Sequence, residues 1–68
     1  MNEDMINVRR IYPAAKQKKY EHVKKFWVIY IRVSELAETW LGVGVTPKIA
    51  WKNAWGKIAI GMVRRLEQ

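Results

Sequence analysis

The side chains of this sequence that could bind a ligand are mostly cationic. Thirteen Lys and Arg residues stand against six Asp and Glu, which gives a formal net charge of +7. The cations are unevenly distributed along the chain, and seven of the thirteen lie between Arg9 and Lys25: Arg9, Arg10, Lys16, Lys18, Lys19, Lys24 and Lys25. Lys and Arg neutralise phosphates and carboxylates, so this balance predicts a polyanionic partner such as nucleic acid, an anionic membrane or an acidic protein.

The sequence contains few residues or motifs that would indicate a catalytic site. Cysteine is absent and His22 is the single histidine, so thiol chemistry and a thiolate metal site are excluded. Glu35 and Glu38 are close enough in sequence to converge on a helix, but both fall on its predicted polar face, where carboxylates are simply solvated. Glycine-rich phosphate loops and metalloprotease motifs are absent from the sequence. We predict no enzyme activity, no metal and no cofactor.

A second polar group lies near the C-terminus. Lys48, Lys52 and Asn53 follow the glycine-containing segment Leu41 to Val45 and alternate with tryptophans. Lys and Asn near the start of a helix are the side chains that read DNA in the major groove. We therefore predict that these three residues make closer contacts with nucleic acid, whereas the N-terminal cations bind its phosphates.

The element that must position this group is a helix of about residues 47–66. Thr46 can cap it, and Pro47 suits its first turn because proline has no N–H to leave unpaired. Its apolar residues fall on two faces. The second face carries Ile49, Ile60 and Val63, which we expect either to be covered by more of the chain or to meet a protein partner.

A longer helix of about residues 20–41 is predicted to precede it, because most apolar residues of this stretch share one face of a helical wheel. The alternative is a strand at residues 26–33, FWVIYIRV, followed by a short helix capped by Ser34. Residues 1–5 are expected to be frayed, residues 6–11 extended, and residues 13–19 an exposed helical turn or basic linker. The prediction is one small all-α domain of 68 residues: a two-helix bundle with a basic N-terminal segment that has a possible short helix.

The sequence also resembles helix-turn-helix DNA-binding domains over residues 34–53. The match is carried by Ser34-Glu35-Leu36-Ala37-Glu38 and by Gly44-Val45-Thr46-Pro47-Lys48, with a longer turn between the halves than the family has. The resemblance implies that Lys48, Lys52 and Asn53 open the recognition helix.

These observations favour a small basic nucleic-acid-binding module, with DNA as partner, and a regulator from a mobile element as one such protein. The alternatives are a protein-binding adaptor or inhibitor that uses the second apolar face or self-associates, and a cationic Trp-rich membrane-active peptide. The longest apolar run, Phe26 to Ile31, is far shorter than the roughly 20 residues that span a bilayer. The N-terminus lacks the cationic and apolar regions of a signal peptide, so we expect a cytoplasmic location.

Overall fold

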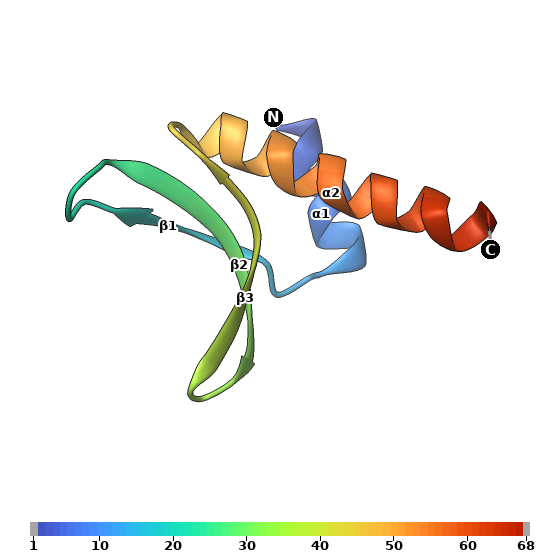
Figure 1. Cartoon of the computed structure of the whole chain (residues 1–68), viewed down its shortest axis with the longest axis horizontal. Helices are drawn as coiled ribbons and strands as arrows, with labels where there is room; N and C mark the ends of the chain where they lie inside the picture. The colour runs from blue at the N-terminus through green and yellow to red at the C-terminus, as the bar shows by residue number, and fades with distance from the viewer. Residues whose placement is uncertain (1, 68) are drawn as a thin grey trace.

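The chain folds as a helix, three strands and a second helix, so the prediction of an all-α bundle is wrong. In the computed structural model the elements are α1 (Glu3–Ile11), β1 (Lys16–Tyr20), β2 (Phe26–Ser34), β3 (Ala37–Gly44) and α2 (Pro47–Glu67). The structure describes residues 2–67, and side chains as far as residue 61. The strands form one antiparallel sheet in the order β1-β2-β3, and both helices lie on the same face of it (Figure 1).

The predicted helix of residues 20–41 is replaced by β2, a turn and β3. The strand alternative at residues 26–33 is therefore the one that the structure adopts, whereas the short helix after Ser34 does not form. Phe26 to Val33 is rich in β-branched and aromatic residues, which suit a pleated surface, and antiparallel pairing on both sides supplies the long-range contacts that a helical wheel omits. Because residues 37–44 are a strand, residues 34–53 do not form a helix-turn-helix.

The N-terminal segment is also more regular than predicted. The Asn2 side chain caps α1 by accepting hydrogen bonds from the backbone N–H groups of Asp4 and Met5, at 3.0 and 3.2 Å. Residues 3–5, expected to be frayed, form the first turn of this helix, and residues 6–11 are helical rather than extended. Residues 16–19, expected in a helical turn or linker, and Tyr20, expected to begin the long helix, form the edge strand β1. Lysines are common on edge strands because they discourage pairing with another chain.

The C-terminal helix was predicted with the correct start. The Thr46 hydroxyl accepts a hydrogen bond from the Ile49 N–H at 3.2 Å, and Pro47 is the first helical residue. Among the described residues, the helices are too short or too polar to cross a bilayer.

Two glycines of β3 allow this helix to touch the sheet backbone to backbone. A Cβ atom on Gly42 would lie 2.4 Å from the Ala54 nitrogen and 2.6 Å from the Ala50 oxygen. A Cβ atom on Gly44 would lie 2.6 Å from the Ala50 nitrogen. These glycines therefore admit α2 at a distance that no side chain permits.

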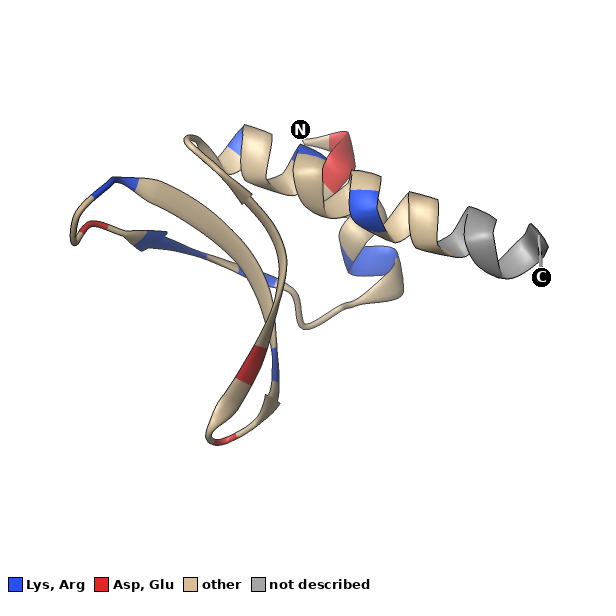
Figure 2. Ribbon diagram, viewed as in Figure 1, with Lys and Arg blue, Asp and Glu red and all other residues tan. Residues whose placement is uncertain are grey.

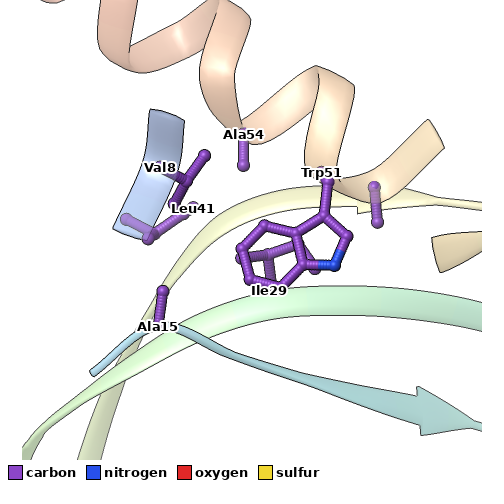
Figure 3. Close-up of a cluster of buried hydrophobic side chains, with 7 residues drawn as sticks. Val8, Ala15, Ile29, Leu41, Trp51 and Ala54 are labelled. Carbon is purple, nitrogen blue, oxygen red and sulfur yellow. The ribbon is translucent and has the colours of Figure 1, made fainter. Parts of the chain in front are cut away.

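A β-bulge at the same place helps to build the core. Ile29 pairs with Gly42 and Tyr30 with Trp40, so Leu41 is an extra residue in β3. Its side chain joins a buried cluster that also contains Val8, Ala15, Ile29, Ala50, Trp51 and Ala54 (Figure 3). Trp51 is the largest member, and its indole N–H donates to the Gln17 side chain at 2.8 Å. The core is therefore a thin layer between α1, α2 and one face of the sheet.

Candidate nucleic-acid interface

The strand register brings two cationic segments to one end of the sheet. Tyr20 pairs with Phe26, so the β1–β2 loop of residues 21–25 closes this end. Trp27 pairs with Gly44, so β3 finishes at the same end and passes directly into α2. Figure 2 shows Lys and Arg in the loop and at the start of α2. Segments more than 20 residues apart in the sequence therefore place cations at the same end of the sheet.

The exposed side chains at this end that could bind an anion are His22, Lys24, Lys25 and Lys48, which we call the sheet-end cluster. Glu21 is exposed in the same loop, where it pairs with Lys19. Lys48 stands in the first turn of α2, and this turn carries no acidic residue. The positive end of the helix dipole adds to its charge, and backbone N–H groups point in the same direction. Such an arrangement suits phosphate groups more than any neutral ligand.

Acidic residues of α1 limit this cluster on one side. Glu3 and Asp4, with Asn2, line a surface hollow together with Thr46, Pro47 and Lys48. Their carboxylates repel phosphates, so the favoured approach to Lys48 is from the side of the β1–β2 loop.

The other N-terminal cations predicted to grip phosphates do not join the cluster. The Arg9 guanidinium lies 5.3 Å from the centre of the Trp51 ring and donates to the Ala15 carbonyl at 3.3 Å, so it packs against the core. Arg10 is exposed in the last turn of α1. The remaining three lie on β1: Lys16 is exposed, Lys18 bonds to Glu38, and Lys19 pairs with Glu21 at 2.8 Å. Alternation along the strand separates Lys19 from the other two, because successive side chains point to opposite faces.

Lys52 and Asn53 of α2, which we predicted to contact bases, lie beside β3. The Asn53 amide donates to the Val43 carbonyl at 2.7 Å, which satisfies an edge group of β3. Because its amide makes this bond, the Asn53 side chain is not positioned to contact bases in a major groove. Lys52 is exposed beside it, along a groove lined by Gly42, Val43 and Gly56.

The apolar face of α2 that we predicted to meet a protein partner is partly exposed. Ile49 is 39% exposed and Ile60 is 56% exposed, and Ile60 lines the same groove as Lys52. The Val63 side chain lies outside the described part of the chain.

The sheet face opposite the helices carries a group of side chains that the sequence analysis did not single out. Val28 and Tyr30 point away from the helices, because the intervening Ile29 points into the core. Four aromatic residues gather around Val28, and with Lys18 we call them the aromatic face: Tyr20, Phe26, Tyr30 and Trp40. The alternation of Phe26, Val28 and Tyr30 could have revealed it, but this period is hidden once the stretch is assigned to a helix.

The rings of the aromatic face contact one another, and the Lys18 ammonium makes cation–π contacts with two of them. Tyr20 stacks on Phe26 with ring centres 5.1 Å apart and planes 8° from parallel. Trp40 is tilted against both, at 5.4 Å from Tyr20 and 6.3 Å from Phe26. The Lys18 ammonium lies over Tyr20 and Tyr30, at 5.1 and 4.5 Å from their ring centres. These contacts bury Val28 completely, although it is not part of the helix-side core.

An ion pair fixes the edge of this face. Glu38 accepts hydrogen bonds from the Lys18 ammonium and, at 3.1 Å, from the Trp40 indole N–H. The two bonds, Lys18 first, hold the pKa of Glu38 below its ordinary value. Hydrogen bonds to Glu38 and then Tyr20 raise the pKa of Lys18. The pair is thus charged at neutral pH and orients Trp40.

Among the described residues, no group of three His, Asp or Glu side chains could hold a metal ion. Comparisons with protein-family models, curated proteins and solved structures find no match to this chain.

Proposed function

We propose that the protein binds duplex nucleic acid through the sheet-end cluster. The observation that carries the proposal is the convergence of the β1–β2 loop and the start of α2 at one end of the sheet. Three lysines and a histidine face solvent there, on a chain of net charge +7. Contacts to phosphates dominate the affinity of such surfaces.

The architecture favours recognition by shape over base reading. Helix α2 buries Ala50, Trp51 and Ala54 against the sheet and engages Asn53 at β3, so its inner face cannot enter a major groove. Contacts by a loop and a helix start suit the backbone of an A-form duplex, whose shallow minor groove exposes 2′-hydroxyl groups. We therefore place duplex RNA ahead of the DNA partner expected from the sequence.

The test is a fluorescence-anisotropy titration of a labelled 20-base-pair RNA duplex and a DNA duplex of matching sequence, at 50 and 200 mM salt. Three phosphate contacts would weaken binding about 40-fold across this range, from a slope of roughly 0.9 per contact measured for DNA. The RNA duplex should bind more tightly than the DNA duplex. Binding that is absent at low salt would overturn the proposal.

Substitutions assign the contacts to the sheet end. The triple variant Lys24→Ala, Lys25→Ala, Lys48→Ala should lose most of the affinity and flatten the salt dependence. The charge-matched control replaces Arg10, Lys52 and Lys57 by Ala; these residues are exposed on α1 and α2 but lie outside the sheet-end cluster. Equal losses in the two variants would show that net charge, rather than this site, governs binding.

A second candidate function is docking of a protein partner along the groove between β3 and α2. Its supporting observation is that Ile60 is half exposed and lines this groove with Gly42 and Val43. Ile60→Asp should then abolish a complex isolated with the unaltered chain, while the far-UV circular dichroism spectrum stays the same. A complex that survives the substitution would reject this face.

A further inference from the structure

The aromatic face has the composition of a surface that binds unpaired bases. It presents four aromatic rings on the side of the sheet that the helices leave open, and Trp40 is 43% exposed. We propose that this face binds single-stranded nucleic acid by stacking bases on Trp40 and its neighbours. The proposal rests on the proposed function only for the class of ligand, since the site lies on another surface.

The rings are held in place before any ligand arrives. Trp40 is fixed by its bond to Glu38 and by contact with Tyr20 and Phe26, and Lys18 holds Glu38 in turn. A ring that is already immobilised loses little conformational entropy when a base stacks on it. Base–aromatic stacking also tolerates any base, because every base has a π-face.

The charge of this face selects an anionic occupant. The strand register places Lys16, Lys18 and Arg32 on it against the single carboxylate of Glu38. Lys16 and Arg32 are exposed and flank the rings, as the cations that track a phosphate backbone do. A second copy of the chain would meet this excess of positive charge with its own, so self-association through this face is disfavoured.

The test compares two labelled probes of equal length and charge: a twelve-nucleotide uridylate RNA and a twelve-unit abasic strand with the same phosphates. Stacking requires bases, so the uridylate should bind at least about tenfold more tightly than the abasic strand. This comparison uses only the unaltered chain and does not depend on the folding of a variant. Equal affinity would overturn the proposal.

A substitution assigns the effect to the face. Trp40→Leu keeps apolar cover over Val28 but removes the π-surface, and should weaken uridylate binding about tenfold while leaving the abasic strand unaffected. Ile60→Ala removes exposed apolar surface from α2 and should change neither affinity. Circular dichroism and thermal unfolding monitor the fold of both variants.

A parallel titration with the RNA duplex separates this inference from the proposed function. Duplex binding with equal affinity for the two single strands would sink the inference and leave the proposed function standing. Uridylate binding that requires bases, without duplex binding, would do the reverse. A dimer detected by sedimentation that Trp40→Leu dissociates would show that a second copy covers the face and would also overturn the inference.

Discussion

The two faces of the sheet bury consecutive residues in different ways. Val28 and Ile29 are both fully buried, although they point to opposite sides. Ile29 lies beneath two helices, in a layer made of small and aliphatic residues around Trp51. Val28 lies beneath side chains of the sheet itself, namely the rings and ion pair of the aromatic face. One face is closed by backbone elements and the other only by side chains.

Because of this difference, one face of the sheet mainly stabilises the fold, whereas the other is exposed enough to bind a ligand. The helix side is buried and depends on close approach, because Gly42 and Gly44 bring α2 within reach of the sheet backbone. The aromatic face has half-exposed rings that can accept a ligand without disturbing the fold. Among the described side chains, every buried hydrophobic residue except Val28 belongs to the helix-side cluster, so most of the stability should come from that side.

The largest expected effect is the contrast between two tryptophans. Trp51→Ala should cost about 3–5 kcal/mol, because it opens a cavity in the core and leaves Gln17 without its partner. Trp40→Ala should cost only about 1–2 kcal/mol, because the ring is half exposed and chiefly loses aromatic contacts. Urea denaturation followed by circular dichroism measures both. Similar losses for the two variants would show that the aromatic face is a second structural core.

A contrast between two glycines tests the close approach. Gly42→Ala should destabilise the protein by about 1–3 kcal/mol, since the new methyl group would meet the backbone of α2. Gly56→Ala is the matched control, because a Cβ atom there meets nothing within 4 Å. In the interior of a helix it should stabilise the protein by about 0.5–1 kcal/mol. A neutral Gly42→Ala would mean that α2 sits farther from β3 than the structure has it.

The smallest expected effect concerns the pH dependence of the aromatic face. A lowered pKa on Glu38 gives stability that is present above the ordinary value of 4.5 and is lost as the pH falls through the folded-state value. A raised pKa on Lys18 gives stability that is present below 10.5 and is lost as the pH rises through its folded-state value. The melting temperature of the unaltered chain should therefore exceed that of Glu38→Gln by a small, constant amount between these limits. Thermal melts across this range check it, and a difference that persists in strong acid would contradict it.

The sequence indicated some elements correctly for local reasons. Thr46 and Pro47 mark the start of α2 because capping chemistry acts within one turn. The polyanion-binding character follows from net charge, which needs no fold, and it remains a prediction.

Other elements required knowledge of long-range pairing. The apolar residues of 20–41 satisfy a helical period nearly as well as an alternating one, and only pairing with β1 and β3 decides between them. Val28 lies outside the apolar face of a helical wheel drawn for residues 20–41, and it is fully buried on the side of the sheet that carries the aromatic face. The sheet-end cluster was equally hidden, since only the register of β2 and β3 places Lys25 and Lys48 at the same end of the sheet.

An amide chemical-shift map would show whether the sheet-end cluster contacts duplex nucleic acid. A ¹⁵N-labelled sample would be titrated with the 20-base-pair RNA duplex at low salt. We expect the largest shifts at residues 21–25 and 46–48, with small changes in the groove between β3 and α2. Shifts centred on that groove, or no shifts at all, would contradict it.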